Sequence, residues 1–262
     1  MSGHSKWAKI KRAKGANDAK RGQLFTKIAN QISIAAREGG GDPEMNFTLR
    51  LAIEKAKNAN MPSASVDKAI DRGTGKSKES MSLQHITYEA IGPGNAAVLI
   101  DCLTDNQNRT YSNVKNIVEN LGGTIASPNS VAWQFEEKGL ITVRSAKITP
   151  SEKFGAPDMI VEVNSDELEL ELFDIPGIEN IEETEIETEE GTFQGFEIYV
   201  NHDDLYNVRT KVDALKVKIE SAELIKEPTQ GITLEAKDEE KLQRFIEEIE
   251  GDEDVENVWT NA

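Results

Sequence analysis

The sequence predicts an α+β fold: an N-terminal three-helix domain followed by two ferredoxin-like α+β domains, the last inserted into the second. Three observations lead to this class: a reversal of charge along the chain, helical spacing of apolar residues up to residue 73, and strand-like alternation from residue 84 onward. Residues 1–80 hold 16 basic and 8 acidic side chains, whereas residues 81–262 hold 14 basic and 39 acidic ones. The first domain is therefore expected to be basic and the other two acidic.

The first predicted domain, residues 1–80, consists of three short helices. Apolar residues recur at three- and four-residue spacing, and Gly39-Gly40-Gly41 ends the first helix. Asp42-Pro43 is typical of a helix cap followed by the first helical residue, and Gly73 ends the third helix. The residues expected to face inward are Phe25, Ile28, Ile32, Ala35, Leu49, Ile53, Ala56, Val66, Ala69 and Ile70.

The second predicted domain combines residues 81–137 with residues 228–262. It begins with a hairpin whose turn is Gly92-Pro93-Gly94-Asn95. The helix and strand after residue 228 are expected to complete the sheet that the hairpin begins. Trp133 and Trp259 are expected in the core. The elements expected after the hairpin are a helix over 111–121, a strand with Val131, Trp133 and Phe135, a helix over 241–249 and a strand over 255–259.

The third predicted domain, residues 138–227, is acidic and inserted. Its elements follow the order β-α-β-β-α-β of a ferredoxin-like unit. Residues 145–164 show no clear pattern, and the acidic run Glu182–Glu190 is interpreted as a solvated strand edge. The elements expected here are strands over 140–143, 181–186, 193–200 and 219–225, with helices over 165–173 and 203–215.

Composition excludes several classes of protein. The single cysteine, Cys102, does not allow an intrachain disulfide, which fits a reducing cytoplasm. No apolar run approaches the roughly 20 residues that span a bilayer, and the N-terminus lacks the apolar segment of a secretory signal. We therefore expect a cytoplasmic protein with no membrane contact, and favour a monomer.

Cations gather at the start of the chain. Up to Arg37 there are nine lysines and arginines and one acid, Asp18, with Trp7 and Ile10 between the cations. Such cations displace counterions from a phosphate backbone, and an aromatic ring can stack on an exposed base. The alternative is a solvated, partly disordered tail that serves solubility. The residues predicted to bind nucleic acid are Lys6, Trp7, Lys9, Lys11, Arg12, Lys14, Lys20, Arg21 and Lys27.

Asn106, Asn108 and Arg109 follow a predicted strand and are a possible contact loop. Their alternative is a helix-capping turn, and we favour a structural role with some contact. The segment Gly73–Ser77 is not a Walker A loop, because Ile70 stands where the first glycine is required. The three histidines have no ligand spacing, and Cys102 lies in an apolar run. We expect no metal, no cofactor and no enzymatic activity.

Several ordered stretches of the chain resemble the YebC/PmpR family, which also includes the mitochondrial translational activator of cytochrome c oxidase. The resemblance implies a transcriptional regulator of gene expression that binds DNA. The alternative is a factor that associates with the ribosome or ribosomal RNA and relieves stalling, for example at proline runs. An acidic protein-interaction module is a third possibility. The stretches are GHSKW (3–7), DAKRG (18–22), FTK (25–27), AAREGGGDP (35–43), LRLAIEKAK (49–57), NANMP (58–62), DRGTG (71–75), YEAIGPGNAA (88–97), LTDNQNRT (103–110) and FEEKG (135–139).

Overall fold

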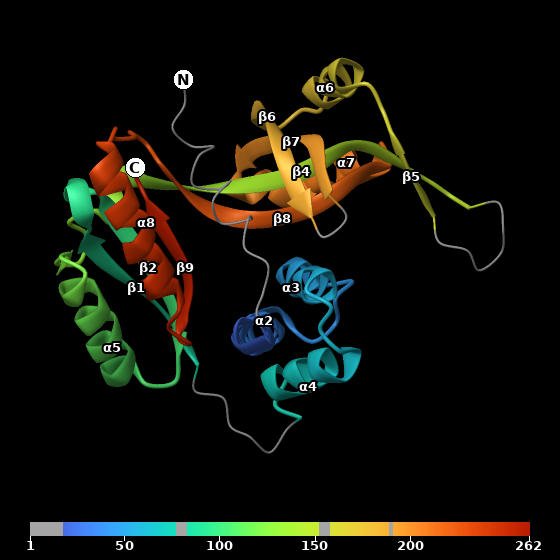
Figure 1. Ribbon diagram of the computed structural model, residues 1–262. Coiled ribbons are helices and arrows are strands. Elements are labelled where there is room, and N and C mark those ends of the chain that lie inside the picture. The colour runs from blue at the N-terminus through green and yellow to red at the C-terminus, as the bar shows by residue number, and fades with distance from the viewer. Residues whose placement is uncertain (1–17, 77–82, 152–157, 189–190) are drawn as a thin grey trace. The chain divides into compact units, whose positions relative to one another are not determined.

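The computed structural model describes residues 18–76, 83–151, 158–188 and 191–262, which form two compact units (Figure 1). The first unit combines the described residues up to Glu136 with Pro228–Ala262, and the second is Glu137–Glu227. The chain leaves the first unit once and returns to it, so the second unit is an insertion in sequence. We keep as a proposal that the first unit comprises two domains, residues 1–80 and residues 81–137 plus 228–262.

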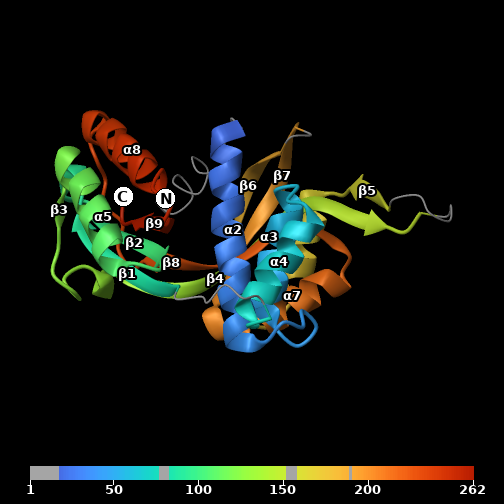
Figure 2. The same cartoon turned by 90° about the horizontal axis from the view of Figure 1, so that it is seen from below.

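Three helices begin the first unit and pack on one another (Figure 2). Their shared core is apolar, as the helical spacing predicted, and Ile28, Ile32 and Leu49 are almost fully buried. Burial of such side chains stabilises a fold by roughly 1.5–3 kcal/mol each. The helices are α2 (Asp18–Gly39), α3 (Phe47–Asn58) and α4 (Ser63–Gly73).

The cap of α3 is Asn46, so the prediction of a cap at Asp42-Pro43 is wrong. The Asn46 Oδ1 accepts the backbone N–H of Leu49 at 3.0 Å, and its Nδ2 donates to the Ala35 carbonyl at 2.7 Å. One buried amide therefore starts α3 and also binds a carbonyl of α2. Asp42 lies in the preceding turn, which leaves Pro43 outside the helix.

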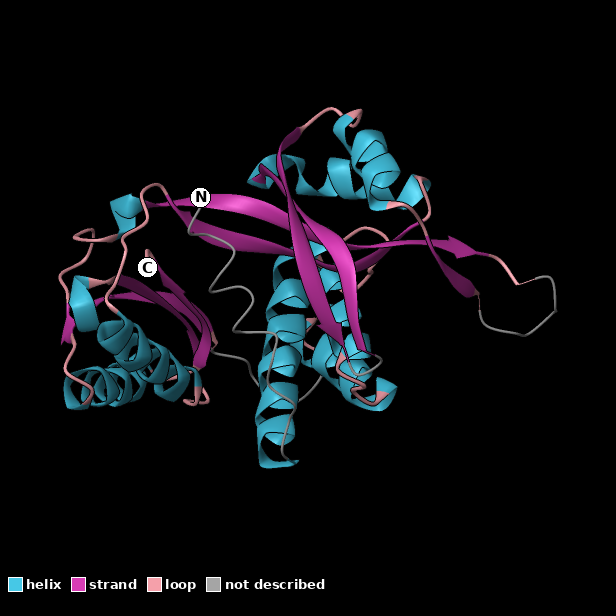
Figure 3. Cartoon of the chain, turned by 45° about the horizontal axis from the view of Figure 1, so that its top comes forward, coloured by secondary structure: helices cyan, strands magenta, loops and turns pink. Residues whose placement is uncertain are grey.

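A four-stranded sheet and two helices complete the first unit. The sheet order is β3-β1-β2-β9, with β1 antiparallel to β2 and to β3, and β2 antiparallel to β9. Helices α5 and α8 cover one face (Figure 3), where Val118, Phe245 and Ile249 are buried. The elements are β1 (Gln84–Ile91), β2 (Ala97–Thr104), α5 (Gln107–Asn120), β3 (Thr124–Ile125), α8 (Ala236–Glu250) and β9 (Val255–Thr260).

The predicted hairpin is present, and its turn is the short helix η1 (Pro93–Asn95). Gly94 has φ of +70°, a conformation that glycine adopts without strain. The predicted strand through Val131 and Trp133 is wrong, because residues 132–134 form a second short helix, η2 (Ala132–Gln134). Trp259 is half-buried on β9, and its Nε1–H donates to Asp101 at 2.7 Å.

The second unit is a sheet with α6 and α7 on one face (Figure 3). Its path is β5-β4-β7-β6, and β8 also pairs with β4, so β4-α6-β6-β7-α7-β8 has the predicted ferredoxin-like order. The elements are β4 (Phe135–Thr149), β5 (Met159–Glu162), α6 (Ser165–Phe173), β6 (Ile178–Thr188), β7 (Gly191–Asn201), η3 (His202–Asp204), α7 (Leu205–Ala214) and β8 (Val217–Pro228).

The predicted class, α+β with N-terminal helices followed by sheet domains, is confirmed. The two sheets differ in how their strands are connected: in the first unit a hairpin joins the two central strands, whereas in the second α6 follows β4 before the β6–β7 hairpin. Of residues 145–164, which had no clear pattern, 145–149 lengthen β4 and 159–162 form β5, whereas 152–157 lie outside the described residues. The acidic strand β6 lies at a sheet edge with Glu183, Glu185 and Glu187 exposed, as predicted for this run, whereas Glu182 is half-buried and Glu189 and Glu190 lie outside the described residues.

Candidate nucleic-acid interface

The predicted binding residues of the N-terminal tract divide into two groups. The first group carries most of the cations and lies outside the described residues: Lys6, Trp7, Lys9, Lys11, Arg12 and Lys14. The second group, Lys20, Arg21 and Lys27, belongs to α2. Residues 1–17 contain five lysines and arginines and no acid, so they contribute more than half of the net +8 of residues 1–80.

The cations of α2 differ in what they can offer a ligand. The backbone of Lys20 lies in the first turn of the helix, and its side chain is outside the described part. Arg21 is exposed, with its guanidinium 5.6 Å from the centre of the Phe25 ring. The Lys27 ammonium donates to the Glu250 carbonyl at 2.6 Å and is half-buried. Arg21 is therefore better placed than Lys27 for a phosphate contact.

Other cations of the three helices hold the helices together. The Arg72 guanidinium donates to the Ser33 hydroxyl at 3.0 Å and to the Asn30 side chain at 2.8 Å, which ties α4 to α2. Arg50 donates to the carbonyls of the turn before α3. Lys57 and Lys68, by contrast, are exposed. These two lysines were not among the predicted binding residues, and only their exposure distinguishes them from the structural arginines.

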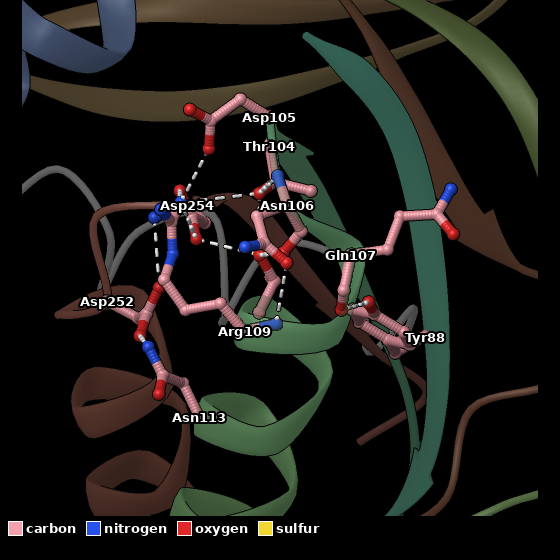
Figure 4. Close-up of polar contacts among 10 residues, drawn as sticks. Tyr88, Thr104, Asp105, Asn106, Gln107, Arg109, Asn113, Asp252 and Asp254 are labelled. Atoms are coloured by element: carbon pink, nitrogen blue, oxygen red, sulfur yellow. Dashed lines mark hydrogen bonds and ion pairs between the residues drawn. The ribbon is translucent and has the colours of Figure 1, made fainter. Parts of the chain in front are cut away.

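The predicted contact loop is built into the fold of the first unit (Figure 4). Asn106 caps α5, since its Oδ1 accepts the backbone N–H of Arg109 at 3.2 Å. The Arg109 guanidinium donates to Asp254 at 3.0 and 2.9 Å and to Asp105 at 3.0 Å. The Thr110 hydroxyl also lies 2.7 Å from Asp254. The geometry accounts for Asn106 and Arg109 as structural groups.

The electrostatics of the loop agree with a structural role for Arg109. The hydrogen bond that Arg109 donates to Asp254, together with the charge of that carboxylate, raises the pKa of Arg109 above its ordinary value, and Asp105 adds to the effect. Asn108 is exposed, and its carbonyl accepts the Ser112 hydroxyl at 2.8 Å. A contact role for Asn106, Asn108 and Arg109 stays a prediction, and Asn108 has the side chain best placed for it.

A second loop, residues 126–134, is organised by a buried carboxylate that the sequence did not reveal. Glu89 is 8% exposed and accepts the backbone N–H groups of Asn129, Val131 (2.7 Å) and Ala132 (2.9 Å). Burial alone would raise the pKa of Glu89, but these backbone hydrogen bonds lower it below its ordinary value. The carboxylate therefore stays charged inside the protein and fixes the path of the loop.

The same loop presents Trp133, for which the predicted core position is wrong. Trp133 is 71% exposed, whereas Val131 is buried. Both residues fit an alternating strand pattern, so the sequence alone could not separate them. The short helix η2 turns Trp133 away from the cluster that Val131 joins with Ala97 and Leu99.

The described residues contain no group of histidine, cysteine and carboxylate side chains that could hold a metal ion. Cys102 is buried in β2, and burial raises the pKa of its thiol, so this cysteine is a core residue as predicted. Within the described ranges, no helix is both long and apolar enough to cross a membrane.

Comparison with known proteins decides the family. Residues 5–76 match the N-terminal domain of TACO1/YebC proteins, and residues 83–262 match the second and third domains. This chain belongs to the TACO1/YebC family. The first match ends at residue 76, after α4, and the second begins at residue 83, before β1. Both matches confirm the resemblance to YebC/PmpR proteins.

TACO1/YebC relatives match over the whole chain. A protein of Rubrobacter xylanophilus is 40% identical over 261 residues, covering 100% of this chain and 95% of its own length. A protein of Chloroflexus aggregans is 44% identical over 264 residues, and YrbC of Bacillus subtilis is 40% identical over 261 residues and is covered to 99%. Each is named a probable transcriptional regulatory protein.

A solved crystal structure is similar to this chain in fold. The crystal structure of the conserved hypothetical protein Aq1575 from Aquifex aeolicus is 32% identical and superposes with a TM-score of 0.79. The match covers 98% of this chain and 96% of the other.

Proposed function

We propose that this protein is a non-enzymatic regulator of gene expression that binds nucleic acid through its basic N-terminal segment. The contacts would come from Lys6, Lys9, Lys11, Arg12 and Lys14, continued by Lys20 and Arg21 at the start of α2. Trp7 would stack on an exposed base. The relatives' name, probable transcriptional regulatory protein, supports the regulatory role. The protein would act in the cytoplasm as a monomer.

The observation that carries this proposal is the segregation of charge along the chain. Five of the first 17 residues are lysine or arginine and none is acidic, whereas residues 81–262 carry a net charge of −25. An acidic body repels a polyanion, so binding must be local and oriented. Binding through such a segment releases counterions and is therefore sensitive to salt.

DNA is the target that the relatives' name favours. A second candidate is structured RNA, including ribosomal RNA, and one observation favours it. The exposed face of α4 carries Asp67 and Asp71 beside Lys68, which disfavours insertion of α4 into the DNA major groove, the usual mode of base readout by a helix. Contacts to phosphate carry no sequence information, so they suit either nucleic acid.

The salt dependence of binding tests the proposal. The full chain is titrated with a duplex DNA and with a structured RNA over a range of salt concentrations. Changing Lys6, Lys9, Lys11 and Arg12 to Ala should make the slope of log affinity against log salt shallower by about 3–4 on duplex DNA, since each phosphate contact contributes about 0.9. Footprinting on genomic DNA and co-sedimentation with polysomes then separate promoter from ribosome.

The matched control removes four cations of the acidic body, Lys115, Lys218, Lys237 and Lys241. This control changes the net charge by the same amount but should leave the slope unchanged. Equal slopes for the wild type and the N-terminal variant would remove the segment from the mechanism. A shallower slope in both variants would mean that net charge, not the N-terminal segment, sets the affinity.

A further inference from the structure

Trp133 is held in an exposed position that folding of the unit does not require. The residue is 71% exposed, although tryptophan is the side chain with the largest apolar area to bury. Its Nε1–H donates to the Ser130 carbonyl at 2.9 Å, within its own loop. The polar edge of the indole is therefore already satisfied, and the ring offers its flat faces to a ligand.

Hydrogen bonds to the rest of the unit fix the backbone on both sides of Trp133. The buried carboxylate of Glu89 fixes the backbone at Asn129, Val131 and Ala132. On the other side of Trp133, the Gln134 carbonyl accepts the Thr229 N–H at 2.8 Å. Carboxylates are rarely buried, and large aromatic rings are rarely this exposed. The exposed ring gains little from folding, whereas the Glu89 hydrogen bonds hold the loop that presents it, and together the two features describe a preorganised binding loop.

The two chain segments that meet at Trp133 carry no charged side chain of their own, and the one carboxylate that binds this loop, Glu89, is buried. Residues 120–135 and 228–234 contain no lysine, arginine, aspartate or glutamate. The two stretches are joined through Gln134, whose side-chain oxygen also accepts the Asn261 amide at 3.0 Å. A polyanion that the carboxylates repel elsewhere on the body is repelled less at this uncharged patch, residues 126–134 with 229–231.

We propose that Trp133 is a stacking platform for an unpaired base of a nucleic acid, separate from the basic N-terminal segment. The inference rests on the proposed function and adds to it a contact that does not depend on salt. Stacking on one ring face needs no hydrogen bond from the indole and tolerates any base, which suits a ring whose N–H is already bound. Phosphate contacts at the N-terminal segment would supply the salt-dependent part.

The test uses the full chain and two probes, a 12-nucleotide oligo-uridine and the matching oligo-thymidine. Trp133→Ala should weaken binding by roughly 5- to 150-fold, the range for loss of one base–aromatic stack, with no change in the salt slope. Trp133→Phe keeps a ring and should bind within a few-fold of the wild type. Leu170→Ala, which trims another exposed apolar side chain (69% exposed), should have no effect.

Fluorescence gives a direct readout at the residue itself. In a Trp7→Phe protein, saturating oligonucleotide should quench part of the emission, and a Trp7→Phe/Trp133→Phe protein should lose that quenching. Wild-type affinity in Trp133→Ala overturns the inference while leaving the proposed function intact, and would assign the ring to a protein partner. An equal loss in Leu170→Ala also overturns it. A wild-type chain that binds neither probe nor any duplex contradicts the proposed function, and the inference with it.

Discussion

The Arg109 guanidinium donates to both carboxylate oxygens of Asp254, at 3.0 and 2.9 Å, although 145 residues separate the two in sequence. The bond joins the start of α5 to the turn before β9 (Figure 4). The inserted unit lies between these two positions in the chain. The pair therefore fastens the two sequence halves of the first unit to each other.

We expect a double-mutant cycle of Arg109→Ala and Asp254→Ala to give a coupling free energy of about 0.5–1.5 kcal/mol, because Asp254 is mostly buried and one guanidinium nitrogen contacts both of its carboxylate oxygens. The measurement is the free energy of unfolding of the four proteins. The exposed pair Lys115 and Glu119, 3.8 Å apart, is the comparison and should give about 0.3 kcal/mol. If Arg109 is structural, Arg109→Ala also leaves the salt slope of nucleic-acid binding unchanged.

Glu89→Gln should loosen the 126–134 loop in a pH-dependent manner. The pKa of Glu89 is lowered from its ordinary 4.5, so its stabilising effect is complete above that pH and is lost as pH falls through the folded-state value. At pH 7 the free energy of opening that protects the loop amides from hydrogen exchange should fall by about 1–3 kcal/mol in the variant, since a neutral amide replaces the carboxylate that accepts their hydrogen bonds. Hydrogen exchange at the amides of Val131 and Ala132 measures this loss.

The difference between wild type and Glu89→Gln should shrink between pH 7 and a pH below the folded-state pKa of Glu89, where the carboxylate is protonated in the folded as well as the unfolded chain. Glu187→Gln, on the exposed edge strand β6, is the control and should not change exchange in the loop at either pH. A constant difference at both pH values would show that shape, not charge, organises the loop.

Arg72→Ala should lower the free energy of unfolding of the three helices by about 1–3 kcal/mol. Its guanidinium binds Ser33, Asn30 and the Ala29 carbonyl, and truncation removes one donor from each of these partly buried acceptors, of which the Ala29 carbonyl keeps the Ser33 hydroxyl. Lys68→Ala, on the exposed face of the same helix, should be close to neutral. Hydrogen exchange of the α2 amides distinguishes the two, and equal exchange in both variants would contradict the assigned role of Arg72.

Two glycines in the helices should respond to alanine in opposite directions. A Cβ at Gly73 would lie 2.2 Å from the Ser33 carbonyl oxygen, so Gly73→Ala must push α4 away from α2 and should cost about 1–3 kcal/mol. A Cβ at Gly22 meets nothing within 4 Å, so Gly22→Ala should stabilise α2 by about 0.5–1 kcal/mol. Thermal unfolding of both variants checks the signs, and a gain in stability from Gly73→Ala would rule out close packing at that residue.

Elements with a strong local signal were predictable from the sequence. The helical spacing of Ile28, Ile32 and Leu49 identified the core of the three helices, and the turn residues identified the β1–β2 hairpin. The 126–134 loop was not predictable, because its conformation depends on Glu89, about 40 residues earlier in the chain. Val131 and Trp133 are both apolar, but Val131 is buried and Trp133 is exposed, in a loop whose backbone the distant Glu89 carboxylate binds.

The candidate site shows the same division between local and distant causes. The cluster of cations at the N-terminus is visible in the sequence, but which cations are engaged is not. Lys27 donates to Glu250, 223 residues away, and Arg109 donates to Asp254. No local sequence pattern predicts that these two cations are already hydrogen-bonded within the protein. Exposure of Arg21, Lys57 and Lys68 likewise emerges only from helix packing.

The antiparallel pairing of β2 with β9 has a consequence for synthesis. Strand β2 ends at Thr104 and its neighbour begins at Val255, so a growing chain must wait for about 150 more residues before that edge is covered. At translation rates of about 5–20 residues per second, the delay is roughly 8–30 s. The 137–227 segment emerges whole during that interval and can fold first, while the edge of β2 is open to chaperones or to mispairing.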